Sequence, residues 1–132
     1  MADKLIYHIT QGISVAVETF YKADHFEQYR DEHLFAYRIT IENLSGFPIK
    51  LQSRHWDIID AFGQHRVVEG DGVVGEQPIL NQEETYTYIS AVNMESEIGK
   101  MYGFYTMINL YNNRTFDVLI PEFMLVVPKI LN

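Results

Sequence analysis

Cysteine is absent from this chain of 132 residues, and only four prolines occur in it. Without cysteine there can be no disulfide and no cysteine-ligated zinc, which suits a reducing compartment and leads us to expect a cytoplasmic protein. No apolar run approaches the roughly 18 residues of a membrane span. The first residues also lack the basic and apolar stretches of a signal peptide.

Positive charge is scarce as well. The chain has 10 basic and 18 acidic residues, hence a net charge of −8, and its arginines and lysines are scattered. Such a surface repels nucleic-acid phosphates and anionic lipid. We therefore expect neither a nucleic-acid partner nor a membrane partner.

Hydrophobic residues make up 47% of the chain and aromatic residues 14%, which is too rich for disorder and suits one domain over residues 1–132. Helical periodicity is nearly absent, whereas apolar and polar residues alternate along the chain. These alternations predict eight strands, over residues 13–18, 35–42, 49–59, 64–69, 84–92, 100–110, 115–120 and 123–127. Short strands at this spacing favour an all-β sandwich or barrel.

Three local features refine this prediction. The apolar alternation changes phase near Ser53, and Pro121 indicates a bend or a change of sheet between the last two strands. The charged, non-periodic stretch from Asp24 to His33 reads as a long exposed loop.

A glycine-rich stretch, Gly70 to Gly75, has the spacing of a dinucleotide-binding loop. A helix starting near Val73 would contain Pro78 beyond its first turn, and the next apolar run reads as a strand. Three nearby carboxylates would repel a phosphate, those of Glu69, Asp71 and Glu76. We expect a strand-to-strand connection and no cofactor, so that NAD, FAD and ATP should not bind. A phosphate site, or a metal site made of those three carboxylates, is the weaker alternative.

Other candidate chemistry is weaker still. His25 and His33 lie among acidic residues and could hold a metal, but their spacing matches no zinc pattern, and a solvated loop is favoured. The acidic residues concerned are Asp24, Glu27, Asp31 and Glu32. Ser53 and His55 would share one face of a strand, yet no strained elbow surrounds the serine. We expect no catalytic residues and no enzymatic activity.

Arg54 and Trp56 would share the opposite face of that strand. The tryptophan could lie half in the core with the arginine stem packed beside it. Alternatively, the two side chains could form a recognition surface, because both types are enriched at binding hot spots.

The sequence resembles the ApaG family over residues 12–128. The resemblance rests on motifs in order, namely Phe35–Asn43, Leu51–Trp56, Gly70–Pro78, Tyr88–Ser90, Gly99–Tyr105 and Ile120–Phe123. It implies an immunoglobulin- or fibronectin-III-like antiparallel β-sandwich of about 7–8 strands. It also implies a genetic link to cobalt resistance and magnesium efflux without an established enzymatic activity. In eukaryotic relatives the domain looks like an interaction module.

These observations favour a non-enzymatic module that binds a protein or peptide. The alternative is direct binding of a divalent cation, expected to be weak, or of a phosphate ligand in metal homeostasis. The residues expected to meet the ligand or partner are those of the glycine loop, Gly70, Asp71, Gly72, Val73, Val74, Gly75 and Gln77. Val73 and Val74 should both be exposed at the tip of that loop, where a partner with a basic or mixed surface would bind.

Overall fold

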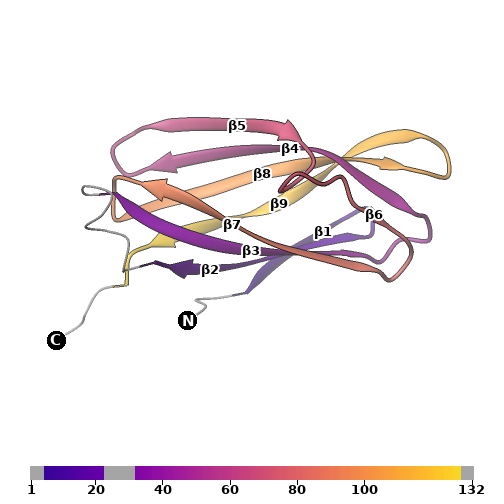
Figure 1. Cartoon of the computed structure of the whole chain (residues 1–132), viewed down its shortest axis with the longest axis horizontal. Coiled ribbons are helices and arrows are strands. Elements are labelled where there is room, and N and C mark those ends of the chain that lie inside the picture. Colours follow the sequence, from indigo (N-terminus) through magenta and orange to yellow (C-terminus); the bar gives the residue numbers. More distant parts are fainter. Residues whose placement is uncertain (1–4, 23–31, 129–132) are drawn as a thin grey trace.

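Two antiparallel sheets pack face to face in the computed structural model, which describes residues 5–22 and 32–128 (Figure 1). The described part of the chain holds nine strands: β1 (Ile6–Thr10), β2 (Ile13–Tyr21), β3 (His33–Asn43), β4 (Ile49–Asp60), β5 (His65–Asp71), β6 (Ile79–Leu80), β7 (Thr85–Met94), β8 (Ile98–Asn109) and β9 (Arg114–Val126). The predicted antiparallel β-sandwich is confirmed. The described residues include no helix that is long and apolar enough to cross a bilayer.

The first sheet has the strand order β1-β2-β3-β7, and the second has the order β5-β4-β8-β9 with β6 paired to β4 (Figure 1). Every pairing is antiparallel. The strand alternation visible in the sequence places one set of side chains between the sheets. In β3, for example, every second residue from His33 to Asn43 is buried.

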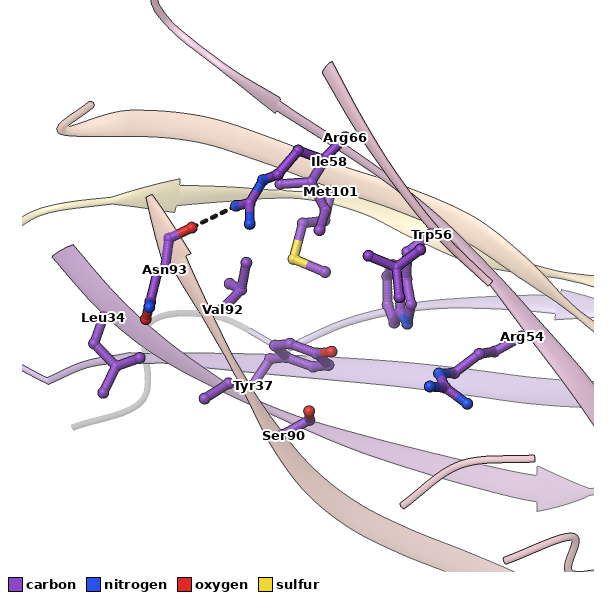
Figure 2. A pocket seen from close by; sticks show the side chains of 12 residues that line it. Leu34, Tyr37, Arg54, Trp56, Ile58, Arg66, Ser90, Val92, Asn93 and Met101 are labelled. Atoms are coloured by element: carbon purple, nitrogen blue, oxygen red, sulfur yellow. Dashed lines mark hydrogen bonds between the residues drawn. The ribbon is translucent and has the colours of Figure 1, made fainter. Parts of the chain in front are cut away.

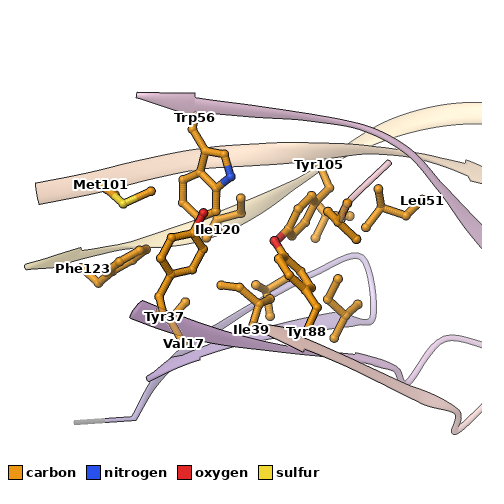
Figure 3. Close-up of a cluster of buried hydrophobic side chains, with 14 of the residues drawn as sticks. Val17, Tyr37, Ile39, Leu51, Trp56, Tyr88, Met101, Tyr105, Ile120 and Phe123 are labelled. Atoms are coloured by element: carbon orange, nitrogen blue, oxygen red, sulfur yellow. The ribbon is translucent and has the colours of Figure 1, made fainter. Parts of the chain in front are cut away.

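Aromatic side chains dominate the middle of the core (Figure 3). Trp56 is 2% exposed and packs edge-on against Tyr37 and Phe123, with ring centroids 5.4 and 5.8 Å apart. The hydroxyl groups of Tyr88 and Tyr105 hydrogen-bond to each other in the same layer. Each of these two buried hydroxyl groups therefore has a hydrogen-bond partner away from water.

The strand predictions hold with three corrections. Two strands, β1 and the two-residue β6, were not predicted. Residues 115–127 were predicted as two strands, but β9 is continuous, and Pro121 lies at a register shift between the pairs Met101–Phe123 and Gly103–Ile120. An edge strand tolerates proline because the missing N–H can face solvent, and a bulge absorbs the kink.

The predicted phase change near Ser53 is confirmed as a register shift between Leu51 and Ser53 in the pairing of β4 with β8. Most of the predicted loop from Asp24 to His33 lies outside the described residues, with His25, Glu27 and Asp31. His33 itself begins β3, is 7% exposed, and hydrogen-bonds through Nδ1 to the Tyr21 hydroxyl at 2.9 Å.

The two long edges of the sandwich differ. On one side β1 packs against β9, and the Leu119 N–H donates to Thr10 Oγ1 at 3.2 Å. On the other side lie β5 and β7, each paired with only one strand in the described structure. Here Arg66 reaches across and donates to the Asn93 carbonyl oxygen. No backbone pairing joins β5 to β7 in the described structure, so the sandwich is open on this side apart from that side-chain bond.

Candidate functional site

The glycine stretch forms a tight turn between β5 and β6. The Val73 N–H donates to the Glu76 carbonyl at 2.8 Å, and the Glu76 N–H donates back to Val73 at 2.9 Å. Gly72 and Gly75 have φ values of 60° and 78°, in the left-handed region that favours glycine. A Cβ on Gly72 would overlap the Glu76 carbonyl oxygen. The loop is thus a strand-to-strand connection, as predicted, and no helix follows it.

Arg54 fastens this loop to β4. Its Nη1 donates to the carbonyl oxygens of Asp71 and Gly72 at 3.1 and 2.9 Å. Gly70 lies directly opposite Arg54 in the pairing of β4 with β5. A Cβ on Gly70 would lie 2.9 Å from that same Nη1, so the absent side chain makes room for the guanidinium group. This glycine is required for close approach and not for an unusual φ.

The two valines of the loop have opposite environments. Val73 is 0% exposed and belongs to the core, so the expectation that it lies at an exposed tip is wrong. Val74 is 62% exposed, as expected, with a φ of 48° that β-branched residues rarely adopt. Gln77 bonds through Nε2 to the Gln52 carbonyl at 2.9 Å. Of the apolar loop residues, Val74 is therefore the one that a partner could touch.

A groove runs between the two sheets on the open side, which we call the β5–β7 groove (Figure 2). Its main cavity has a volume of about 320 Å³, and the lining side chains include Tyr37, Arg54, Trp56, Arg66, Ser90 and Val92. A second cavity of about 190 Å³ shares Arg54 and Trp56 and extends to Val74 and Ile89. Ile89 is 58% exposed, so the groove has an apolar rim next to the glycine loop.

Two arginines line this groove without a carboxylate partner among the described residues. Within the described residues, neither Arg54 nor Arg66 forms an ion pair with a carboxylate, although the chain carries a net charge of −8. The indole Nε1 of buried Trp56 also has no hydrogen-bond acceptor in the described part of the chain. Buried indole N–H groups normally have one. The groove therefore has two cationic side chains without carboxylate partners in the described chain, and one indole N–H without an acceptor there lies beside them.

Arg54 and Trp56 lie together on the inner side of β4. Trp56 is a core residue, buried more deeply than the half-buried position of the first alternative. Arg54 lines both cavities beside it, and the recognition surface stays a prediction.

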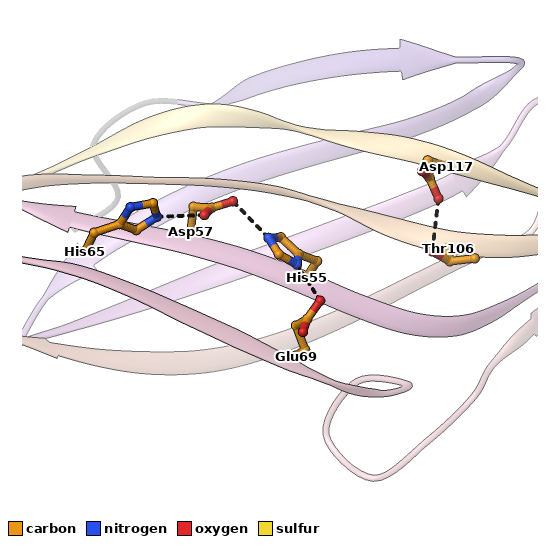
Figure 4. Close-up of polar contacts among 6 residues, drawn as sticks. All are labelled: His55, Asp57, His65, Glu69, Thr106 and Asp117. Carbon is orange, nitrogen blue, oxygen red and sulfur yellow. Dashed lines mark hydrogen bonds and ion pairs between the residues drawn. The ribbon is translucent and has the colours of Figure 1, made fainter.

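A polar cluster lies on the outer face of the β5-β4-β8-β9 sheet, on the opposite side of β4 from the groove (Figure 4). His55 Nδ1 and Nε2 contact carboxylate oxygens of Glu69 and Asp57 at 2.7 and 3.0 Å, and His65 Nε2 contacts Asp57 at 2.7 Å. The His55 ring stacks on Phe104 with centroids 4.9 Å apart. Both His55 nitrogens face acceptors, so the doubly protonated imidazolium fits the site best.

Hydrogen bonding sets the charges of this cluster. The pKa of His55 is raised, mainly by its hydrogen bond to Glu69, against an opposing effect of desolvation. The pKa of Asp57 is lowered, mainly by its hydrogen bond to His65. The cluster therefore combines cationic and anionic groups that stabilise each other's charged forms.

This arrangement gives no support to the catalytic or metal alternatives. In the described chain no hydrogen bond joins Ser53 to His55, whose ring nitrogens are both engaged by carboxylates. A general base needs a free nitrogen. The described residues also contain no group of three or more His, Asp or Glu side chains placed to hold a metal ion. Of the proposed ligands Glu69, Asp71 and Glu76, the first is committed to His55.

The sequence did not predict that Arg54 and Arg66 share a groove, and it did not predict the polar cluster on the outer face. The outer one follows from the hairpin at Asp60–Gly63, because its register places Glu69 directly opposite His55. The same register places Arg66 and Arg54 on the inner side of the sheet, opposite Ile58 and Gly70. The predicted hairpin could therefore have indicated both groupings, because its turn fixes which residues of the two strands lie opposite each other.

Comparisons with known proteins agree with the fold. A family model for the ApaG domain matches residues 23–109. Protein ApaG of Vibrio cholerae serotype O1 is 43% identical over 120 residues, covering 91% of this chain and 94% of that protein. Protein ApaG of Thiobacillus denitrificans is 42% identical over 120 residues, with the same coverage of both chains.

Solved structures lead to the same result. The crystal structure of the ApaA protein from Bordetella pertussis superposes with a TM-score of 0.84 at 34% identity, covering 94% of this chain and 97% of that one. These names state no enzymatic activity. A matching domain model, relatives above 40% identity over nine-tenths of the sequence, and a shared sandwich together show that this chain belongs to the ApaG family.

Proposed function

We propose that this chain is a non-enzymatic protein-interaction module whose binding surface is the β5–β7 groove. The observation that carries the proposal is the open side of the sandwich, where two edge strands flank a groove with two arginines that have no carboxylate partner among the described residues. Edge strands expose N–H and C=O groups that pair readily with an added strand, and recognition domains use such edges to bind extended peptides.

The rim of the groove supports the same function. Val74 holds an exposed apolar side chain in a left-handed conformation, which costs a β-branched residue on the order of 1–2 kcal/mol. Backbone strain at an exposed loop position motivates a functional hypothesis, because folding alone would favour glycine or asparagine there. Val74 and Ile89 provide apolar contact area beside the polar groove.

On this proposal, the family link to cobalt resistance and magnesium efflux would run through a protein partner. Direct cation binding remains a prediction without a supporting group of ligands in the described chain. A cytoplasmic location likewise remains a prediction from composition.

The test is affinity capture from the native cell with matched baits that differ at one edge residue of β7. Ala91→Pro removes one backbone N–H, whereas Ala91→Val retains it and suits a strand. A partner retained by the wild type and by Ala91→Val, but lost from Ala91→Pro, would support the proposal. Capture that is indifferent to all three baits would refute the groove as the binding surface.

A further inference from the structure

The backbone of β7 presents its free groups at regular positions. The Asn43 N–H donates to the Glu84 carbonyl at 3.0 Å, so the backbone groups of Glu84 face β3. Because the direction of the backbone N–H and C=O groups alternates along a strand, those of the even-numbered residues of β7 face β3. Those of the odd-numbered residues point away from β3, towards the open side of the sheet. The bond from Arg66 to the Asn93 carbonyl agrees with this parity. The backbone groups that point away from β3 therefore belong to Thr87, Ile89, Ala91 and Asn93, and of these the Asn93 carbonyl is already bonded to Arg66.

This edge lacks the usual protection against an added strand. Exposed edges commonly carry charged residues, proline or bulges that discourage pairing. β7 reads Thr-Tyr-Thr-Tyr-Ile-Ser-Ala-Val-Asn-Met, with no charged residue and no proline, and its pairing with β3 has no register shift. The facing edge strand, β5, differs because it carries the carboxylates of Glu69 and Asp71.

A strand added to β7 would direct every second side chain into the groove. The residues opposite Ser90 and Val92 would point inward, as those two side chains do. Both belong to the lining of the main cavity, together with Arg54, Arg66 and the indole of Trp56 (Figure 2). Arg54 also shares the second cavity with Ser90, and Arg66 bonds to Asn93 near the other end. The two arginines, which lack carboxylate partners in the described chain, thus lie along the path of two alternate inward side chains.

From this geometry, and resting on the proposed function above, we infer that the natural ligand is an extended acidic segment of another protein. It adds to β7 as a fifth strand of that sheet and places carboxylates at two alternate positions in the groove. One carboxylate faces Arg54 and the Trp56 N–H, and the other faces Arg66. Hydrogen bonds from charged donors to carboxylates are about twice as strong as neutral ones, so the two arginines would select acidic residues.

Charge also favours β7 as the edge that the segment uses. An acidic strand paired with β5 would meet the carboxylates of Glu69 and Asp71 as well as Arg66, whereas β7 is uncharged. The expected partner is therefore acidic at the groove, in contrast to the basic or mixed surface expected at the glycine loop from sequence. Outside the groove the net charge of −8 would disfavour acidic partners in general, so affinity should depend on entry into this cavity.

The experiment measures fluorescence anisotropy of two labelled peptides against the full chain. One peptide alternates Thr and Asp, and the other alternates Thr and Asn, which has the same shape without charge. We expect the Asp peptide to bind about ten-fold more tightly, and its affinity to fall as salt is added. Arg66→Gln should remove most of this preference, and Ala91→Pro should weaken both peptides, with Ala91→Val as the matched control.

The outcomes separate this inference from the function on which it rests. Equal binding of the two peptides, with loss only in Ala91→Pro, would overturn the acidic ligand while leaving strand addition intact. No binding of either peptide, together with a concentration-dependent dimer that Ala91→Pro dissociates, would mean that a second copy occupies β7 and would overturn the inference. Loss of the Asp preference in Arg66→Gln, at an unchanged melting temperature, would support it.

Discussion

The two sides of strand β4 make different kinds of interaction. On the inner side, Arg54 and Trp56 hold the glycine loop and the aromatic core, and both line the groove. On the outer side, His55 and Asp57 join a charged network at the solvent-facing surface. Residues that are neighbours in sequence therefore differ in what they stabilise, because a strand sends alternate side chains to opposite faces.

The comparison also shows that the net charge of the chain does not give the sign of the charge at each part of its surface. The chain is acidic overall, and carboxylates surround the histidines of the outer cluster. The inner groove contains two arginines without ion-pair partners among the described residues. Histidines and carboxylates are thus paired on the outer face, whereas the arginines of the groove have no carboxylate partner in the described chain. The inner side should control stability and ligand choice, and the outer side should control the response to pH.

The largest effect should come from Trp56→Ala on the inner side. This substitution removes a side chain that is 2% exposed and packs on two other rings, so the domain should lose about 3–5 kcal/mol of unfolding free energy. Urea denaturation followed by circular dichroism measures the loss. His55→Ala, one position away on the outer side, is the control and should cost much less. Similar costs for the two variants would abolish the distinction between the sides.

The next largest effect concerns the fully buried Val73. Val73→Ser opens a small cavity and buries a hydroxyl group, so it should destabilise the domain by about 2–4 kcal/mol. Val74→Thr is the matched control, since it changes the adjacent exposed residue and keeps its branched shape; it should stay within about 0.5 kcal/mol. Denaturation midpoints compare the two. Equal and small shifts would show that Val73 is not part of the core.

Much of the fold could be predicted because period-two alternation reports burial directly. The phase change near Ser53 could be read from the sequence, since the bulge moves the apolar set from Ile49 and Leu51 to Trp56 and Ile58. Strand β1 escaped prediction because its residues are mostly exposed and give no clean alternation. Pro121 suggested a break, but only the neighbouring strand shows that a bulge accommodates it.

The candidate site was harder to predict because it depends on pairing between strands. The glycine loop could be recognised as a turn from its carboxylates and Pro78. Its two valines look alike in sequence, and only the closing bonds between Val73 and Glu76 place one inside and one outside. Likewise, Arg54 and Arg66 are distant in sequence, and their shared groove follows from register and from the room above Gly70.

A smaller effect of opposite sign is expected at Val74. Val74→Asn should raise the unfolding free energy by about 1 kcal/mol, because asparagine tolerates the left-handed conformation that strains valine. If the apolar rim contributes to recognition, the same variant should weaken partner capture. Thermal denaturation and the capture assay provide the two readouts. A stabilised variant with full binding would show that the strain has no role in recognition.

The smallest effect is a pH dependence from the outer cluster. The folded-state pKa of His55 is raised above its ordinary value of 6.5, with the hydrogen bond to Glu69 as the main cause. A group whose pKa is raised by folding stabilises fully below its unfolded pKa, and its contribution is lost as pH rises through the folded pKa. Stability should therefore decline modestly as pH increases from about 6 towards 8.

The opposite rule applies to Asp57, whose pKa is lowered from 3.8, mainly by His65. Its contribution is present above that value and is lost as pH falls through the folded pKa, so the cluster stabilises most between the two transitions. His55→Gln should flatten the decline above pH 6 by removing the group that titrates there. Melting temperatures of the wild type and the variant across this range measure the change. Because the cluster is on the solvent-facing side, where ion pairs are worth little, a decline as large as the loss in Trp56→Ala would contradict the division between the two sides of β4.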